Sequence, residues 1–215
     1  MASFLIVHGR DNVRSAEHWQ WWLAERLRVA GACVRYPQLP RPDAPDLGRW
    51  LEVLRREYAQ LGDGERVVVC HSLGCVLWHA AWARMTLTRP AERVLLVAPP
   101  GPSVLDEPVT ADFGHLDDPG ALLGSCRARI RMVASERDPY CVEGCAAKLY
   151  GEPLGLDSET LEGAGHLTPA SGYGPWPGVL AWCLDGAFRF GENASLSAAP
   201  SVRDSSGSGH PRGRE

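Results

Sequence analysis

The chain has 215 residues, 45% of them hydrophobic, and a formal net charge of −4 at pH 7. This length suits one domain with a full hydrophobic core, and a mildly acidic chain lacks the basic surface that binds nucleic acid or anionic membranes. No stretch approaches the ~18 apolar residues of a membrane span, and the N-terminus has no signal-peptide pattern. The seven cysteines are an odd number in a chain too long to need disulfide bonds, so we expect reduced thiols and a cytoplasmic location.

Short apolar runs alternate along the chain with segments whose apolar residues recur at helical spacing. In chain order, the predicted elements are a strand at 4–7, a helix at 19–30, a strand at 32–36, a helix at 47–58, a strand at 66–70, a helix at 76–85, a strand at 93–98, a short helix at 121–126, a strand at 130–134, a helix at 142–149, a strand at 155–161 and a helix at 177–188. Ser15 and Asp46 are candidate N-caps of the first two helices. This alternation predicts an α/β fold: a doubly wound sheet of six mostly parallel strands with helices on both faces.

Two segments fall outside this alternation. Residues 99–126 are rich in Pro, Gly and Asp, and they predict either a lid over a site or an ordinary crossover with one short helix. Residues 191–215 contain almost no large apolar side chains, so they cannot bury enough surface to offset the entropy of ordering. We therefore expect one domain over residues 1–190 and a disordered tail over 191–215.

Two cofactor signals are absent from the sequence. Cys141 and Cys145 are four residues apart, but no second Cys or His pair lies nearby to complete a zinc site. No Gly-x-Gly-x-x-Gly follows the first predicted strand, and no Gly-Lys-Ser/Thr phosphate loop occurs anywhere. We therefore expect no metal and no nucleotide cofactor.

The third predicted strand leads into a serine, Ser72, and a helical pattern begins directly after it. Small residues lie two places before and two places after this serine, at Cys70 and Gly74. A strained turn between a strand and a helix brings these two positions close together, so both must be small. The N-terminus of the following helix then presents free N–H groups near the serine. This layout predicts a nucleophile elbow with Ser72 at its tip.

A serine hydroxyl needs a base that takes its proton and an acid that orients the base. The chain offers Ser72, Asp138 and His166, each directly after a predicted strand, in the order typical of α/β-hydrolases. Because the carboxyl ends of parallel strands share one sheet edge, these side chains can converge there. The rival acids are Asp106, Asp112, Asp117 and Asp118, and the other histidines are His8, His18, His71, His79, His115 and His210. We expect His71 to point away from the adjacent serine.

Acyl transfer also requires hydrogen-bond donors for the oxyanion that develops on the attacked carbonyl. One candidate is the backbone N–H of Leu73, directly after the serine. The second is the backbone N–H of Arg10, because Gly9 allows the loop after the first strand to approach closely.

The chain resembles a small serine-hydrolase family of α/β-hydrolases that includes retinoblastoma-binding protein 9 and the bacterial YdeN-like proteins. The resemblance spans about residues 3–185, and its most specific parts are His18-Trp19-Gln20 and the segment Ala-Ser-Gly-Tyr-Gly-Pro-Trp-Pro at 170–177. It implies a triad at Ser72, Asp138 and His166 and a compact α/β-hydrolase fold without a large cap domain. Cys70 departs from the family's pattern, which usually has glycine there.

These observations predict a cofactor-free serine hydrolase that cleaves small carboxylic esters or related acyl compounds through an acyl-enzyme. The alternative is a protein-binding module on a hydrolase scaffold with weak or vestigial activity, suggested by the eight tryptophans and the proline-rich 37–45 loop. No motif identifies a protein partner, the acyl-chain size, or a choice between ester, thioester and amide. Phe113, Tyr173 and Trp176 are candidates either for a pocket wall or for the core.

Overall fold

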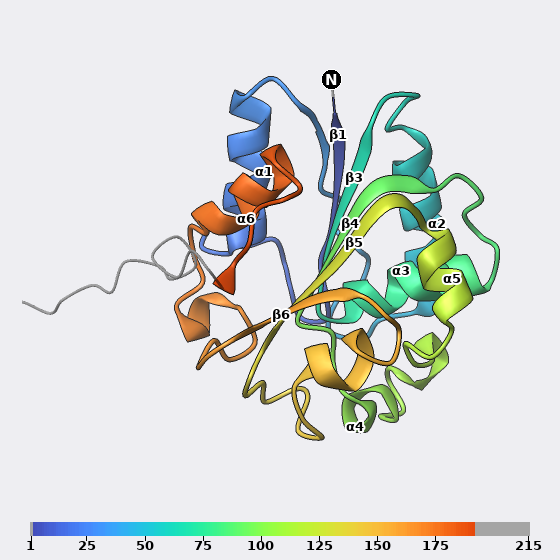
Figure 1. Ribbon diagram of the computed structural model, residues 1–215. Coiled ribbons are helices and arrows are strands. Elements are labelled where there is room, and N and C mark those ends of the chain that lie inside the picture. Colours follow the sequence, from blue (N-terminus) through green and yellow to red (C-terminus); the bar gives the residue numbers. More distant parts are fainter. Residues whose placement is uncertain (1, 192–215) are drawn as a thin grey trace, which may run out of the picture.

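The computed structural model describes residues 2–191, which form a twisted six-stranded sheet between two layers of helices (Figure 1). The strands are β1 (Ser3–Val7), β2 (Cys33–Arg35), β3 (Arg66–His71), β4 (Ala91–Val97), β5 (Cys126–Ser135) and β6 (Asp157–Leu161). Their order in the sheet is β2-β1-β3-β4-β5-β6, and every neighbouring pair is parallel. The predicted α/β doubly wound sheet is therefore confirmed, with all six strands parallel.

Helices cover both faces of this sheet (Figure 1). On one face lie α1 (Trp19–Val29) and α6 (Pro177–Leu184), and on the other lie α2 (Leu47–Ala59), α3 (Leu73–Ala83) and α5 (Pro119–Gly124). Because successive strand residues point to opposite faces, Val67 and Val69 of β3 pack under α1, whereas Val68 packs under α3. Trp19 and Trp78 are fully buried on opposite faces, so each layer has its own aromatic core.

The local caps explain where the first two helices begin. Asp46 caps α2 as predicted, because its carboxylate accepts the N–H of Arg49 at 2.8 Å. Ser15 does not cap α1. Its side chain and carbonyl instead close a turn over residues 15–18, and the cap is His18, whose Nδ1 accepts the N–H of Gln20 at 3.2 Å.

Several predicted elements differ from the structure, and the helix predicted at 177–188 ends at Leu184. The segment 142–149 forms turns and then a π-helical turn, η2 (Ala147–Gly151), because Gly144 adopts a φ of 147° that a continuous helix cannot contain. β5 begins at Cys126, so α5 ends earlier than expected. The rest of the 99–126 segment contains α4 (Pro102–Leu105) and a 3₁₀ turn, η1 (Ala111–Phe113).

Three arginines of the central strands fasten the last described segment to the sheet. Arg93 of β4 donates to two carbonyl oxygens at the end of α6. Arg129 of β5 donates to the carbonyl oxygen of Gly186 at 2.7 Å, and the fully buried Arg131 donates to that of Phe188. Arg131 also pairs with carboxylates of β6. The predicted tail, apart from residue 191, lies outside the described residues.

Over residues 2–191, no helix is long and apolar enough to cross a membrane. Within the same range, no three His, Cys, Asp or Glu side chains lie together in a way that could hold a metal ion. All seven cysteines are free thiols, including Cys141 and Cys145.

Candidate active site

Ser72 lies at the sharp turn between β3 and α3. Its φ of 53° and ψ of −129° belong to a region that side chains other than glycine rarely adopt. The turn packs tightly on the end of β1: a Cβ atom at Gly74 would lie 2.8 Å from the carbonyl oxygens of both Val7 and His8. Glycine is therefore required two places after the serine, and the predicted elbow geometry is present.

Cys70, two places before the serine, fits in this turn without distortion of the strand. Its side chain is fully buried and belongs to the core under α3. Burial raises the pKa of the Cys70 thiol well above its ordinary value, and burial likewise raises the pKa of Cys75, whose Sγ lies 3.5 Å from the carbonyl oxygen of Val97. Both thiols are therefore packing groups beneath the elbow and have no access to the solvent.

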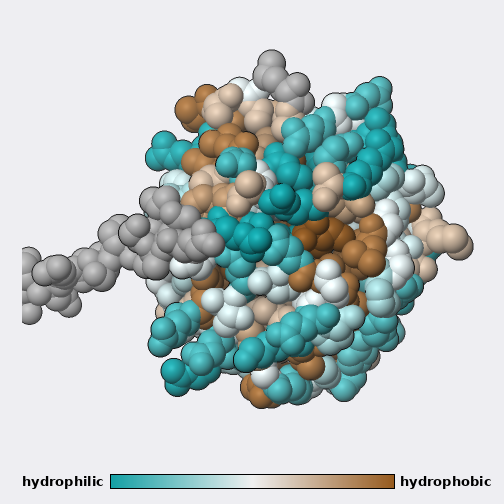
Figure 2. Space-filling model, in the orientation of Figure 1, coloured by the Kyte–Doolittle hydropathy of each residue, from teal (hydrophilic) through white to brown (hydrophobic). Residues whose placement is uncertain are grey.

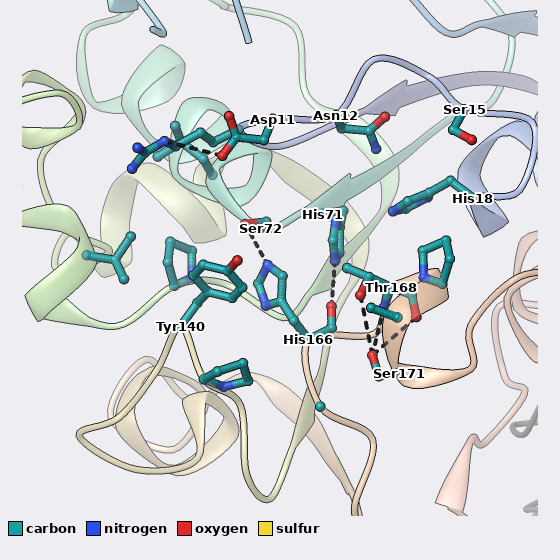
Figure 3. A pocket seen from close by; sticks show the side chains of 18 of the residues that line it. Asp11, Asn12, Ser15, His18, His71, Ser72, Tyr140, His166, Thr168 and Ser171 are labelled. Carbon is teal, nitrogen blue, oxygen red and sulfur yellow. Dashed lines mark hydrogen bonds and ion pairs between the residues drawn. The ribbon is translucent and has the colours of Figure 1, made fainter. Parts of the chain in front are cut away.

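The structure brings Ser72, His166 and Asp138 together in one hydrogen-bonded series, of which Figure 3 shows the Ser72–His166 bond. Ser72 Oγ lies 2.9 Å from His166 Nε2, and His166 Nδ1 lies 2.8 and 3.0 Å from the two carboxylate oxygens of Asp138. Asp138 is 5% exposed and also accepts the backbone N–H of Tyr140 at 2.9 Å. The three side chains come from the ends of β3, β5 and β6, the arrangement predicted from the strand order.

Two of the rival acids have other roles in the structure. Asp106 lies 3.0 Å from Nε2 of His115, and Asp118 caps α5 by accepting the N–H of Ala121. Neither takes part in the series that contains Ser72.

Two side chains hold the backbone of the loop that follows β6, at His166 and Leu167. The sequence did not identify either side chain for this role. His71 Nε2 donates to the carbonyl oxygen of His166 at 2.9 Å, and Trp19 Nε1 donates to that of Leu167 at 2.7 Å. Leu167 has a φ of 53°, so the loop turns sharply between these two anchors. His71 was expected only to point away from Ser72, and the structure places its ring 4.9 Å from that of His166 and on the cavity wall. The family-specific His-Trp motif was the available signal.

The ring of Tyr140 covers His166 on another side. The two ring centroids are 4.4 Å apart, and Tyr140 is half exposed at the mouth of the site. The neighbours of His166 therefore fix both its backbone and the position and orientation of its ring.

The two predicted oxyanion donors lie beside Ser72. Leu73 is the first residue of α3, and the first N–H groups of a helix have no intrahelical partner. A Cβ atom at Gly9 would lie 2.6 Å from Ser72 Cβ, so Gly9, the residue before Arg10, packs directly against the serine. His8 Nδ1 donates to the carbonyl oxygen of Gly9 at 2.7 Å. In a trans peptide the N–H points opposite to the carbonyl, so the N–H of Arg10 faces away from His8.

The site contains three further histidines, His8, His18 and His71, which we call the three neutral histidines. Desolvation lowers the pKa of His8 and of His18 to about 4, and it lowers the pKa of His71 well below its usual range. The hydrogen bonds fix the tautomers. His8 donates from Nδ1 and accepts the N–H of Leu39 at Nε2, whereas His71 donates from Nε2.

Comparison with known proteins places this chain in a family. Residues 4–183 match the sequence profile of the serine hydrolases. The chain belongs to the serine hydrolase family. It is 25% identical over 177 residues to the hydrolase YdeN of Bacillus subtilis (strain 168), a match that covers 80% of this chain and 89% of YdeN. The resemblance to YdeN-like serine hydrolases is thereby confirmed.

Solved structures show the same fold. The crystal structure of the B. subtilis ydeN gene product superposes with a TM-score of 0.73 at 22% identity and covers 86% of this chain and 97% of that one. A YdeN-like hydrolase from Pectobacterium atrosepticum superposes with a TM-score of 0.65 at 19% identity and covers 91% of this chain and 90% of that one. This serine hydrolase therefore has the compact α/β-hydrolase fold of its relatives.

A cavity of about 870 Å³ opens above Ser72 in this serine hydrolase. Apolar and aromatic residues contribute part of its lining, among them Leu73, Pro100, Val104, Pro139 and Tyr140. Its wall on the side away from Tyr140 is polar, and the residues there include Asn12, Ser15, His18, Thr168 and Ser171 (Figure 3). Because Val104, Glu107 and Thr110 also line it, the 99–126 segment contributes a wall of the cavity as well as being a crossover.

The aromatic residues considered for the pocket wall belong to the core. Phe113 and Trp176 are each 1% exposed and Tyr173 is 8% exposed, and none of them lines the cavity. Phe113 packs on Trp50 under α2, and Tyr173 packs on Trp176 under α1.

Proposed function

We propose that this serine hydrolase is a carboxylesterase-like enzyme that cleaves small carboxylic esters or related acyl compounds through Ser72, His166 and Asp138. The hydrogen-bonded series from Ser72 Oγ through His166 to Asp138 carries the proposal, because each link has the atom and the distance that nucleophilic catalysis requires. We further propose a cytoplasmic location, because seven free thiols suit a reducing compartment.

In the first half of the reaction, His166 Nε2 takes the proton of Ser72 while Oγ attacks the carbonyl carbon. The carbonyl oxygen becomes an oxyanion that accepts the backbone N–H groups of Leu73 and Arg10. Asp138 stabilises the imidazolium that forms. The imidazolium then gives its proton to the departing alcohol, and the carbonyl re-forms as an acyl-enzyme on Ser72.

In the second half, His166 takes a proton from water, and the hydroxide attacks the acyl carbon. The proton returns to Ser72 Oγ as the acid leaves. One general base contributes on the order of 10²–10⁴-fold to such a rate, and one oxyanion donor contributes about 10²–10³-fold. The open cavity admits small and medium acyl groups.

A fluorophosphonate probe tests this proposal directly. We expect the wild-type protein to be labelled, Ser72→Ala to be unlabelled, and Ser103→Ala, a change at an exposed serine of α4, to be labelled like the wild type. A series of 4-nitrophenyl esters of increasing chain length then gives the acyl preference. A folded wild-type protein that neither reacts with the probe nor hydrolyses any ester would refute the proposal and favour a binding function instead.

A further inference from the structure

His18 presents a hydrogen-bond donor to the cavity. Its Nδ1 accepts the N–H of Gln20 at the start of α1, and the ring is neutral at pH 7. A neutral imidazole that accepts at Nδ1 has its hydrogen on Nε2. His18 is 7% exposed and lines the cavity. Within residues 2–191, Nε2 has no hydrogen-bond partner, so this donor is left for a ligand.

His71 faces His18 with the opposite polarity. Its Nε2–H donates to the carbonyl oxygen of His166, so its Nδ1 carries a lone pair and is an acceptor. The two rings are 5.3 Å apart at an angle of 63°, and in Figure 3 they lie next to each other beside Ser72. No partner for this acceptor is found among the described residues. The cavity wall thus combines one neutral donor with one neutral acceptor.

The surroundings of this pair are also polar. Asn12, Ser15, Thr168 and Ser171 lie on the same side of the cavity as His18, away from Tyr140 (Figure 3). Because neither ring nitrogen has a partner among the described residues, a ligand that pairs with both gains two hydrogen bonds. This side of the cavity therefore suits hydrogen-bonding groups of a ligand.

The charges at the site disfavour an anionic ligand there. Asp11, Glu17 and Glu107 line the cavity, and Arg10 is the one cation that lines it. The guanidinium of Arg10 is already paired with Glu107 at 2.7 Å and lies 3.5 Å from Asp11. The neutral donor and acceptor therefore suit a group that is itself neutral and can both accept and donate, and a hydroxyl group is the simplest such group.

We propose that His18 and His71 form a polar subsite that binds a neutral hydroxyl group of the substrate, so that this hydrolase prefers hydroxylated acyl compounds over their hydrocarbon analogues. This inference rests on the proposed function, because it concerns the same cavity and the same reaction at Ser72. His18 Nε2–H donates to the substrate hydroxyl, and His71 Nδ1 accepts from it.

Matched substrate pairs test the preference. One pair differs in the acyl part, 4-nitrophenyl butyrate against 4-nitrophenyl 3-hydroxybutyrate, and the other in the alcohol part, propyl butyrate against 2,3-dihydroxypropyl butyrate. We expect wild-type kcat/KM to favour the hydroxylated member of at least one pair by about 10-fold or more, since a site built for a hydroxyl discriminates strongly. Acid release measured by pH-stat serves for the second pair.

Two variants assign the preference to His18. His18→Phe keeps an aromatic ring but has no donor, and His18→Ser keeps a helix-capping oxygen but lacks the imidazole. We expect the preference ratio to fall toward 1 in both. His115→Phe, the same change at a histidine outside the cavity, keeps the wild-type ratio.

A wild-type ratio near 1 in both pairs, or a ratio unchanged in both His18 variants, would overturn the subsite while the esterase proposal stands. If no ester is hydrolysed and the fluorophosphonate probe does not react, both proposals fall together.

Discussion

Replacing Ser72 by glycine and by alanine measures the strain that the elbow stores. Both variants lose the hydrogen bond between Ser72 Oγ and His166 Nε2, so the difference in stability between them does not include the contribution of this bond. Only glycine can adopt a φ of 53° and a ψ of −129° without a steric cost. We therefore expect Ser72→Gly to be more stable than Ser72→Ala.

The magnitude follows from two opposing effects. A residue other than glycine in such a conformation costs about 1–3 kcal/mol, which glycine recovers. Glycine also makes the unfolded chain more flexible, which costs about 0.4–1 kcal/mol. The net difference is about 1 kcal/mol in favour of glycine, and in a domain of this size that raises Tm by about 2–4 °C.

Differential scanning calorimetry at pH 7 gives the comparison. Ala83→Gly is the matched control: this exposed residue ends α3 in an ordinary helical conformation, so glycine there lowers stability by about 0.5–1 kcal/mol. If Ser72→Gly melts at or below the temperature of Ser72→Ala, the elbow is not strained in the way that its dihedral angles indicate.

Three further predictions concern the surroundings of the triad. Trp19→Phe removes the donor that holds the loop after His166, so we expect kcat to fall about 10-fold with little change in KM, and an unchanged kcat would contradict this. At pH 8, N-ethylmaleimide should modify the exposed Cys33 and leave Cys70 and Cys75 unmodified with full activity, as peptide mass spectrometry can check. The three neutral histidines bind protons in the unfolded chain below about pH 6.5 but resist them in the folded one, so the stability of the folded chain should fall as the pH drops below 6.5. A Tm that is the same at pH 5 and pH 7 would show that these rings accept protons without unfolding.

The sheet and the residues at its edge could be predicted from the sequence because the patterns that indicate them are local. A β-branched run that stops at Ser72, followed at once by a helix, leaves few alternatives for the backbone, and the strand order then brings Asp138 and His166 to the same edge. The helix predicted over 142–149 failed for a different reason. Apolar spacing there resembles a helix, but Gly144 takes a conformation that interrupts it, and no periodicity reveals that choice.

The supporting residues could not be derived because their partners are distant in sequence. Trp19 reaches the carbonyl of residue 167, and His71 reaches that of residue 166, across packing that only the folded chain defines. The pocket wall was missed in the same way. Aromatic side chains near the end of the sequence looked suitable, whereas the cavity is lined by short loops whose side chains carry no pattern of their own.

The arginines of β4 and β5 bond to residues near the end of the domain, which are synthesised after the whole sheet. Their carbonyl acceptors lie between residues 182 and 188, so a nascent chain released only as far as β6 lacks these carbonyl oxygens, and Arg131 has only the carboxylates of β6 as partners. Domains generally fold as units during translation. The hydrogen bonds that join these arginines to the end of the domain therefore form only after the final helix has left the ribosome, and a stop codon placed before residue 188 would remove the Phe188 carbonyl oxygen to which Arg131 donates.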